Sequence, residues 1–412
     1  MHSTPNKLPP CIVLGLETQI GLSIVRELGR AGVPVIGIAQ EYNAIGLKSR
    51  YLARSLVISN PRSSELISEI RALGEELGEC CLITVSEANL IWLASHRNEF
   101  GTVKPIIPPQ AALEIVLDKQ RTLQTAQSLG ITVPETAEPS SMAEVERLAG
   151  RLRFPVVLKW KDPNAALQYL RPNGIELVKA EYAYSAEEFL HIARRYLPAE
   201  MWPLVQEYCP GIGLGQFFYM HEGVAIRRFQ HIRIAEWPPE GGFSSVCDAV
   251  PLVEHQELQE QSIALLQAIG WQGVAMVEYR FDPLAERAVL MEINGRYWGS
   301  YPLAMHSGAS FALLSYYLES QLGIPPMPAV RQDMRCRMVV TELKRLWRIW
   351  FHPHLIADRS FTIRRLAESF RFISDFFRPR VCYYVWTIGD PGPFMADVRN
   401  LFHKLLRRNK AI

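Results

Sequence analysis

The chain has 412 residues, of which 48% are hydrophobic and 21% are charged, and its formal net charge is +2. This composition is ordinary for a folded protein, and the length predicts two or three domains. No uninterrupted apolar run approaches the ~20 residues of a membrane-spanning helix, so we expect no such helix.

The N-terminus and the cysteines indicate the compartment. Residues 1–10 are polar and proline-rich, and Glu17 and Gln19 interrupt the apolar stretch that begins at Cys11, which argues against a secretory signal. The seven cysteines are scattered and include no C-x-x-C pair. We therefore expect reduced thiols in a cytoplasmic protein, and neither a disulfide framework nor a zinc site.

The charges are unevenly distributed along the chain. Residues 331–412 hold 17 of the 44 Lys and Arg residues but 7 of the 42 Asp and Glu residues, a local charge of +10 against −8 for the remainder. Trp347 and Trp350 beside Lys344 and Arg348 are typical of an amphipathic helix at an anionic membrane surface. Contact with another protein, or packing onto the chain's own body, are the alternatives, and the sequence favours packing.

The first hundred residues alternate short apolar strands with amphipathic helices. Strands are expected at 11–16, 33–39, 52–59 and 81–86. Strands separated by helices in this way build βαβ units on a parallel sheet. We therefore expect a Rossmann-like α/β domain over residues 1–112. Its first turn, VLGLETQIG, lacks the middle glycine of G-x-G-x-x-G, so no dinucleotide site is expected.

The next segment, residues 113–324, mixes helices with antiparallel strands, which predicts an α+β domain. Residues 217–234 are expected to form a hairpin that turns at His221–Gly223. Residues 162–174 are expected to be a loop that leads into a strand over 175–181.

Two further segments follow from composition. WPPEGGFSS, residues 237–245, is expected to be a mobile loop because it is polar and rich in glycine and proline. From Pro325 the chain becomes rich in Arg, Phe and Trp with helical periodicity, so residues 325–412 are expected to be a basic helical region. A homo-oligomer is compatible with the sequence.

The most informative stretch is VLMEINGRYWGS, which begins at Val289. Its apolar residues look like a buried strand, and strand side chains alternate between faces, so Glu292, Asn294 and Arg296 should point the same way. Glu278 lies in a similar strand fourteen residues before Glu292. If the two strands pair around a turn near Pro283, the two carboxylates face each other.

Two facing carboxylates need a neutralising cation. At ~4 Å they repel by roughly 4 kcal/mol at an effective dielectric near 20. Carboxylate and amide oxygens are hard ligands that suit Mg²⁺ or Mn²⁺, and Mg²⁺ usually completes its shell with water and phosphate oxygens. Glu278, Glu292 and Asn294 are therefore the predicted metal ligands, a nucleotide triphosphate is predicted to share the site, and Arg296 is the predicted contact of a transferring phosphoryl group.

The two strands and the sequence after them, up to Phe311, resemble the metal-binding end of an ATP-grasp domain, and most of all the carboxylate–amine ligase branch, which shares features with carbamoyl-phosphate synthase. The likeness covers residues 10–320, and its strongest motif is E-I-N-G-R-Y-W-G. It implies a pre-ATP-grasp domain, a two-lobed ATP-grasp domain, and two Mg²⁺ ions held by the two glutamates and the asparagine.

The resemblance also implies nucleotide contacts. DKQRTLQTAQSLGITVPET is similar to the family's entry helix and FPVVLKW to its phosphate-binding strand, which gives Lys119 and Lys159 phosphate-binding roles. LVQEYCPG looks like the hinge whose backbone at Gln206, Glu207 and Cys209 would bind adenine.

Two features depart from the family pattern. Only Asn173-Gly174 remains of the glycine-rich loop that usually covers the phosphates, and Gly295 replaces a frequent proline after the asparagine. Phosphate coverage by backbone N–H groups is therefore the least supported part of the resemblance.

The implied activity is ATP-dependent ligation of a small carboxylate to an amine through an acyl phosphate, with release of ADP and phosphate. Arg233, with His231 nearby, is the candidate to bind the substrate carboxylate or the acyl phosphate, although an exposed hairpin face is an equal alternative. Bicarbonate or carbamoyl chemistry, and a nucleotide-binding module without catalysis, are the rival functions. No nucleic-acid partner is expected, because no reader motif is present.

Overall fold

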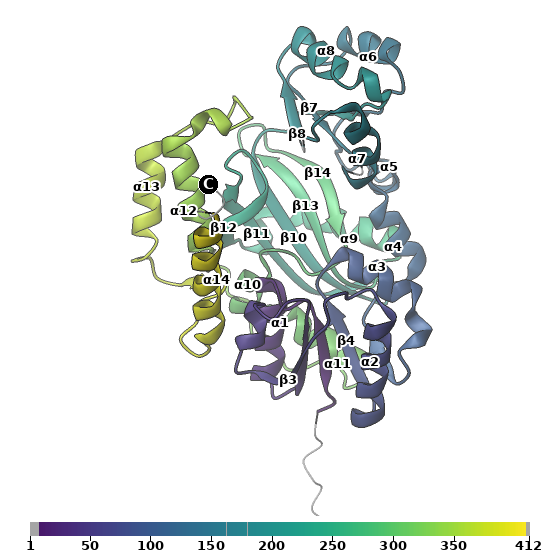
Figure 1. Ribbon diagram of the computed structural model, residues 1–412, viewed down its shortest axis with the longest axis vertical. Coiled ribbons are helices and arrows are strands. Elements are labelled where there is room, and N and C mark those ends of the chain that lie inside the picture. Colours follow the sequence, from purple (N-terminus) through teal and green to yellow (C-terminus); the bar gives the residue numbers. More distant parts are fainter. Residues whose placement is uncertain (1–7, 162, 179, 409–412) are drawn as a thin grey trace, which may run out of the picture.

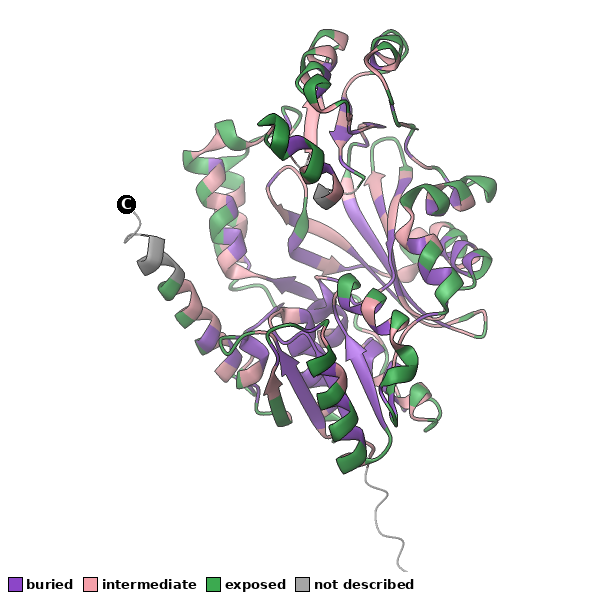
Figure 2. Cartoon of the chain, turned by 45° about the vertical axis from the view of Figure 1, so that its right-hand side comes forward, coloured by how far each residue is buried: buried purple, intermediate pink, exposed green. Residues whose placement is uncertain are grey.

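The computed structural model describes residues 8–161, 163–178 and 180–408, which fold around three sheets (Figure 1). The ends of the predicted first and last domains, and positions 162 and 179 of the predicted loop and strand, lie outside the described residues. Figure 2 shows that buried residues concentrate in the N-terminal and central sheets.

The N-terminal sheet is parallel, with the strand order β3-β2-β1-β4-β5. Its strands are β1 (Cys11–Leu14), β2 (Val35–Ala39), β3 (Leu52–Val57), β4 (Cys80–Thr84) and β5 (Val103–Pro105). The connecting helices are α1 (Gln19–Arg30), α2 (Ser64–Leu77) and α3 (Glu87–Ser95), with 3-10 turns η1 (Ile45–Lys48) and η2 (Arg97–Glu99). β1 and β4 are buried throughout because helices cover both faces of the sheet. The predicted parallel α/β layer is confirmed.

The central sheet has seven strands in the order β14-β13-β10-β11-β12-β15-β16. They are β10 (Ile212–His221), β11 (Val224–Trp237), β12 (Phe243–Ala249), β13 (Gly273–Asp282), β14 (Arg287–Asn294), β15 (Arg335–Arg337) and β16 (Val381–Tyr383). The predicted hairpin is confirmed: β10 and β11 are joined at Glu222 and Gly223, whose φ angles of 49° and 77° lie in the left-handed region.

Helices cover both faces of the central sheet. On one side lie α4 (Gln110–Leu117), α5 (Lys119–Ser128) and α9 (Gln256–Ile269), which share an apolar core with β10, β13 and β14. On the other lie α10 (Tyr301–His306) and α11 (Phe311–Glu319), whose core continues into α1 and β1. The N-terminal domain is thereby packed against the central sheet, next to the carboxyl end of β14 (Figure 1).

A smaller lobe stands above the central sheet in Figure 1. Its antiparallel sheet has the order β6-β9-β7-β8. The strands are β6 (Thr136–Ala137), β7 (Val156–Lys159), β8 (Ala180–Ala183) and β9 (Leu204–Glu207), and the helices are α6 (Met142–Ala149), α7 (Pro163–Leu170) and α8 (Ala186–Arg194), with turns η3 (Arg171–Asn173) and η4 (Leu197–Ala199). We call residues 136–207 the upper lobe.

The structure corrects the predicted loop before β8. Residues 163–170 form helix α7, because Ala166 and Leu170 are buried against Trp160 and Tyr196. Proline is tolerated in a first helical turn, where its missing N–H has no intrahelical partner. The predicted strand over 175–181 shrinks to β8, which begins at Ala180.

The prediction of a mobile loop over residues 237–245 is also wrong in part. Gly241 and Gly242 form a tight turn, since a Cβ at Gly242 would lie 2.2 Å from the Trp237 carbonyl oxygen. β12 then begins at Phe243, and Ser244 and Ser245 are buried.

The sequence predicted a helical C-terminal region, but the structure shows strands in it as well as helices. Its helices are α12 (Val339–Phe351), α13 (Arg365–Ser374) and α14 (Gly392–Arg408), and the turn η6 (Pro353–Leu355) follows α12. Outside this region, one more turn, η5 (Leu252–His255), precedes α9. However, β15 pairs with β12 and β16 pairs with β15, so two short strands extend the central sheet. Among the described residues, no helix has both the length and the apolar character to cross a membrane.

Candidate active site

The two predicted carboxylates face each other across the β13–β14 ladder, where Glu278 pairs with Glu292. The register shifts immediately afterwards, so that Tyr279 pairs with Leu290 and Met291 is an extra residue. Such a bulge redirects the side chains around it. Met291, expected to be buried core, instead lines a cavity together with Lys119.

Glu292 has a cation on one side and an amide on the other. Lys119 Nζ lies 2.8 Å from Glu292 Oε2, and Asn294 Nδ2 donates to Glu292 Oε1 at 3.1 Å. Lys119 is the first residue of α5 because the Asp118 carboxylate caps that helix. Burial opposes ionisation of Glu292, but Lys119 and Asn294 outweigh it and lower its pKa. Glu292 is therefore an ionised carboxylate at neutral pH.

Glu278 is held by Arg233. Arg233 Nη2 lies 2.6 Å from Glu278 Oε2, and its Nη1 donates to Glu236 at 3.0 Å and to the Gly242 carbonyl at 2.8 Å. Burial raises the pKa of Glu278 although Arg233 opposes the shift, and the nearby charge of Glu292 adds to it. Each glutamate of the pair therefore already has a cationic partner, Lys119 for Glu292 and Arg233 for Glu278, and a bound divalent cation would share the two carboxylates with them.

The donor set fits a divalent cation of the magnesium type. Two carboxylates and one amide oxygen are hard ligands, and Mg²⁺ commonly takes one or two carboxylates at a phosphate site. Among the described residues, no cluster of three or more His, Cys, Asp or Glu side chains has metal-binding geometry. The candidate site consists of two carboxylates and one amide, those of Glu278, Glu292 and Asn294.

A cavity of about 340 Å³ opens beside these residues, between α5, β14 and the upper lobe. Lys119, Lys159, Gln206, Leu204 and Met291 are among its lining residues. A smaller hollow shares Lys119 and Met291 with it and continues to Glu292 and Asn294. Both predicted phosphate-binding lysines thus line the cavity, and Lys119 also lines the hollow that reaches the carboxylates. The volume suits a small-molecule ligand.

Lys159 makes the site sensitive to pH. Burial, with repulsion from Lys119, lowers the pKa of Lys159 to about 8. The ammonium form is present below this pKa and is lost above it. We therefore expect nucleotide affinity to fall as the pH rises from about 7 to about 9, as measured by calorimetry. In Lys159→Arg, which stays charged throughout this range, the decline should be absent; an equal decline in both proteins would contradict the role of Lys159.

Of the three predicted hinge residues, Gln206 lines the cavity, and the backbone of Gln206 and the amide of Glu207 already have partners within the protein. Gln206 belongs to β9, which pairs with β6 on one side and with β7 on the other, so its backbone is part of the sheet. Gln206 therefore reaches the cavity through its side chain. The Glu207 amide donates to the Glu135 carbonyl at 2.8 Å, and its carboxylate binds Arg287. Cys209 is buried, and its burial raises the pKa of the thiol to about 11.

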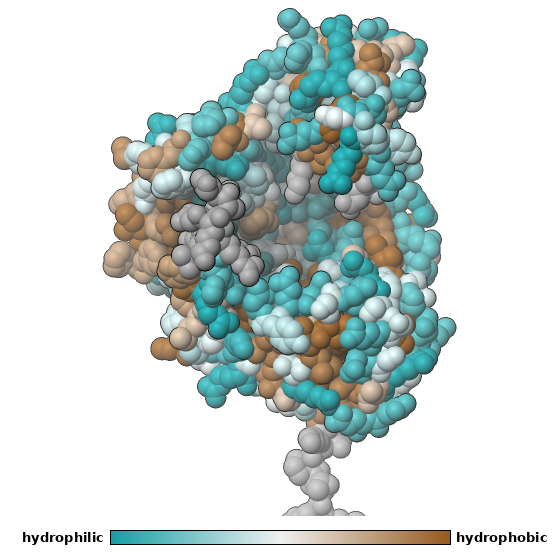
Figure 3. Space-filling view, viewed as in Figure 1, coloured by the Kyte–Doolittle hydropathy of each residue, from teal (hydrophilic) through white to brown (hydrophobic). Residues whose placement is uncertain are grey.

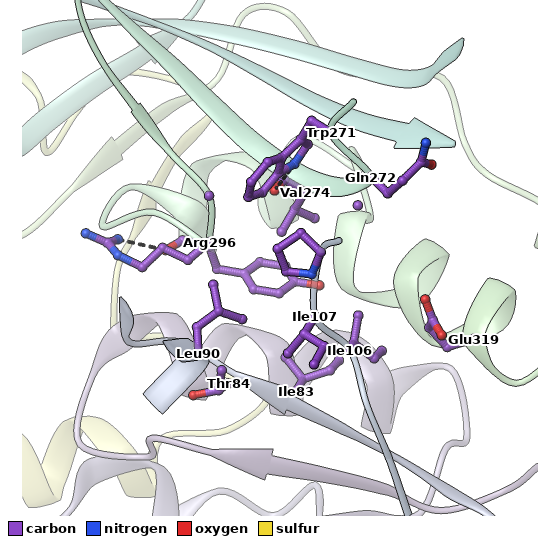
Figure 4. A pocket seen from close by; sticks show the side chains of 14 residues that line it. Ile83, Thr84, Leu90, Ile106, Ile107, Trp271, Gln272, Val274, Arg296 and Glu319 are labelled. Carbon is purple, nitrogen blue, oxygen red and sulfur yellow. Dashed lines mark hydrogen bonds between the residues drawn. The ribbon is translucent and has the colours of Figure 1, made fainter. Parts of the chain in front are cut away.

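Arg296 does not follow the alternation predicted for it. β14 ends at Asn294, so the rule that places alternate side chains on one face no longer applies at residue 296. The Arg296 guanidinium donates to the Tyr297 carbonyl at 3.0 Å. Figure 4 shows it extending away from a small pocket between β4 and β13, whose labelled residues include Leu90 and Trp271.

Sequence reasoning missed two glycines that support the site. A Cβ at Gly213 would lie 2.5 Å from Arg233 Cδ, and one at Gly215 would lie 2.7 Å from His231 Nε2. Glycine within a strand often marks such a close approach, and that signal was present in IGLGQ. His231 itself is not on an exposed face: it is buried, its Nδ1 lies 3.1 Å from Ser300 Oγ, and burial lowers its pKa well below the usual value.

A second missed feature is a C-terminal contact with the upper lobe. The Asp358 carboxylate accepts hydrogen bonds from Tyr184 Oη at 2.7 Å and Tyr208 Oη at 2.8 Å. Arg359 extends the contact through an ion pair with Glu188 at 2.8 Å. Tyr184 and Asp358 are 174 positions apart in the sequence, and no short-range sequence pattern predicts a contact between them.

We expect this contact to restrain the upper lobe. Because hydrogen bonds to a charged group contribute about 1.5–3 kcal/mol, Asp358→Asn should make opening of the lobe easier by a similar amount. Hydrogen exchange of the α8 amides should speed up accordingly. Arg359→Gln is the control, since it removes an exposed ion pair that contributes little. Unchanged α8 exchange in Asp358→Asn would show that the contact does not hold the lobe.

Comparisons with known proteins bear on this arrangement. The chain matches no protein-family model. The D-alanine–D-alanine ligase of Ectopseudomonas mendocina (strain ymp) is 25% identical over 198 residues. The match covers 45% of this chain and 55% of that ligase, so the chain spans about half the length of the curated relative.

Solved structures extend the likeness over more of the chain. Biotin carboxylase of Campylobacter jejuni, in a β,γ-ATP complex, superimposes with a TM-score of 0.60 at 16% identity. The match covers 79% of this chain and 74% of the biotin carboxylase chain. The chain has the ATP-grasp fold. L-amino acid ligase of Bacillus licheniformis, with a TM-score of 0.55 at 15% identity over 78% of this chain and 76% of that one, shares it. N5-carboxyaminoimidazole synthetase of Staphylococcus aureus, in complex with ADP, also shares this fold, with a TM-score of 0.55 at 13% identity. The match covers 76% of this chain and 78% of that chain. The predicted ATP-grasp resemblance is confirmed.

Proposed function

We propose that this ATP-grasp protein is an ATP-dependent, ADP-forming ligase that joins a small carboxylate to an amine. The observation that carries the proposal is the facing pair Glu278 and Glu292, with Asn294, at the end of a cavity that contains Lys119 and Lys159. Paired carboxylates beside two lysines match the needs of a metal-bound triphosphate. The names of the similar ligases support the same chemistry.

In the proposed reaction, a carboxylate oxygen of the substrate attacks the γ-phosphorus of ATP and the bond to ADP breaks. The amine nitrogen then attacks the acyl carbon of the acyl phosphate, inorganic phosphate leaves, and the amine loses a proton to solvent. Bound Mg²⁺ or Mn²⁺ would neutralise the phosphate charge. Lys119 and Lys159 would hold the phosphates, and Glu278, Glu292 and Asn294 would hold the metal.

The carboxylate substrate is proposed to lie in a second cavity next to the carboxylate pair. This cavity, of about 390 Å³, is lined by Arg233, Glu236 and Arg280 from the central sheet and by Arg345 and Asp358 from the C-terminal region. Arg233 is retained as the proposed contact of the substrate carboxylate because it lines the cavity directly beside Glu278. Arg296 is retained as a proposed contact of the transferring phosphoryl group. Gln206, Glu207 and Cys209 are the proposed adenine contacts, with Gln206 acting through its side chain.

Hydroxylamine trapping tests this function. The protein would be incubated with Mg²⁺, ATP and pools of small carboxylates and amino acids, with hydroxylamine as the acceptor amine. A hydroxamate that forms together with ADP supports the acyl phosphate, and deconvolution of the pool identifies the acid. Formation of AMP would mean adenylation and would overturn the proposal. ADP release stimulated by bicarbonate alone would favour bicarbonate chemistry, and tight ATP binding without turnover would favour a non-catalytic module.

A further inference from the structure

The outer surface of α12 and α13 exposes large apolar side chains. Trp347 and Phe351 of α12 are 60% and 61% exposed, and on and after α13 the exposed fractions are 78% for Leu366, 74% for Phe370 and 84% for Phe377. Figure 3 shows hydrophobic residues gathered at this edge of the molecule, over the two helices. Apolar patches of this kind on a folded protein indicate an interaction surface. We call the exposed side chains of residues 343–351 and 364–377 the α12–α13 face.

The charges of this segment are sorted by sign. Its acidic residues are turned inward: Glu342 binds Arg337 at 2.7 Å, Asp375 binds Arg335 at 2.6 Å, and Glu368 binds Arg345 at 2.6 Å. The fourth, Asp358, is buried against Tyr184 and Tyr208.

The exposed charged residues of the same segment are all cationic: Lys344, Arg359, Arg364 and Arg365. Lys344 lies among the exposed aromatics of α12, and Arg364 and Arg365 lie at the start of α13. The α12–α13 face therefore presents apolar and positively charged groups together, without an exposed carboxylate among residues 339–377, all of which the structure describes.

We propose that the α12–α13 face binds the surface of an anionic phospholipid bilayer. Aromatic and aliphatic side chains that protrude beside Lys and Arg can enter the boundary between headgroups and acyl chains while the cations contact lipid phosphates. A second copy of this chain fits less well, because a twofold contact through this face would bring cations against cations with no exposed carboxylate to pair them.

The proposal does not rest on the ligase function, since none of the residues of the carboxylate pair or of the ATP cavity belongs to this face. A Glu292→Gln protein should bind vesicles as the wild type does. Loss of activity and loss of membrane binding are therefore separable results.

Vesicle flotation tests the proposal. The full chain is mixed with phosphatidylcholine vesicles that do or do not contain about 30% phosphatidylglycerol. We expect binding only to the anionic vesicles, and less of it at high salt. The triple variant Leu366→Ser/Phe370→Ser/Phe377→Ser should lower the vesicle partition coefficient by about tenfold or more, because it removes three apolar anchors. Arg364→Glu/Arg365→Glu should lower it by about fivefold or more for each changed residue.

The matched control is Leu284→Ser, which removes an equally protruding leucine, 96% exposed, from the β13–β14 turn. It should bind vesicles normally, and the melting temperature of each variant shows whether it is folded. Absence of binding to anionic vesicles, or equal binding by the folded triple variant, would overturn the proposal. So would a wild-type oligomer in solution that the triple variant converts to a monomer, since the face would then be a protein contact.

Discussion

The Glu292→Gln variant is expected to lose about 10²–10³-fold in kcat for ADP formation while keeping its fold. The substitution keeps the size of the side chain and its contact with Asn294, but it removes the negative charge that faces Glu278 and binds Lys119 at 2.8 Å. Only one carboxylate then remains to hold a divalent cation. Steady-state turnover, with Mn²⁺ binding measured by electron paramagnetic resonance, checks both effects.

The matched control for this variant lies in the same hairpin. Glu286→Gln changes an exposed carboxylate in the β13–β14 turn and should leave turnover and Mn²⁺ binding unchanged. Full ATP-dependent activity in Glu292→Gln would remove this residue from the catalytic site. Equal losses in both variants would point to a disturbed hairpin and not to a lost metal ligand.

The largest effect on stability is expected for Arg233→Met. The Arg233 guanidinium is the shared partner of Glu278 and Glu236, and the side chains of all three are at most 15% exposed. Removing one partner of a buried ion pair leaves an uncompensated charge and costs about 3–5 kcal/mol. Chemical denaturation should show a loss of this size, accompanied by an increase in the pKa of Glu278.

Added Mg²⁺ distinguishes a metal site from an ordinary ion pair in this variant. If Glu278 and Glu292 bind the cation, millimolar Mg²⁺ should restore part of the stability of Arg233→Met, because ligand binding to the folded state stabilises it. The same addition should have little effect on a protein that also carries Glu292→Gln. A stability of Arg233→Met that does not respond to Mg²⁺ would argue against a metal at this position.

The part of the site that could be predicted depends on local regularities. Glu278 and Glu292 belong to one hairpin, so strand alternation and a short turn sufficed to place them opposite each other. Lys119 and Lys159 were assigned from the ATP-grasp resemblance, and the structure places both on the same cavity. Arg296 shows the limit, because the strand ends two residues before it.

The unpredicted features depend on contacts between distant segments. β15 and β16 have three residues each, too few to show a period; β15 forms by pairing with the edge of β12, and β16 forms by pairing with β15. Helix α7 contains a proline and an asparagine that favour a loop, but burial of Ala166 and Leu170 outweighs that preference. The contact of Asp358 with the upper lobe likewise has no local signal.

Transfer of oxygen from substrate to phosphate tests the central claim most directly. The protein would be incubated with Mg²⁺, ATP, unlabelled bicarbonate, an amine pool and carboxylic acids labelled with ¹⁸O in the carboxyl group, and the released phosphate would be analysed by mass spectrometry. An acyl phosphate requires that one carboxylate oxygen leave with the phosphate, so we predict singly labelled phosphate in wild type and its loss in Glu292→Gln. ADP release with unlabelled phosphate would contradict ligation through an acyl phosphate at this site.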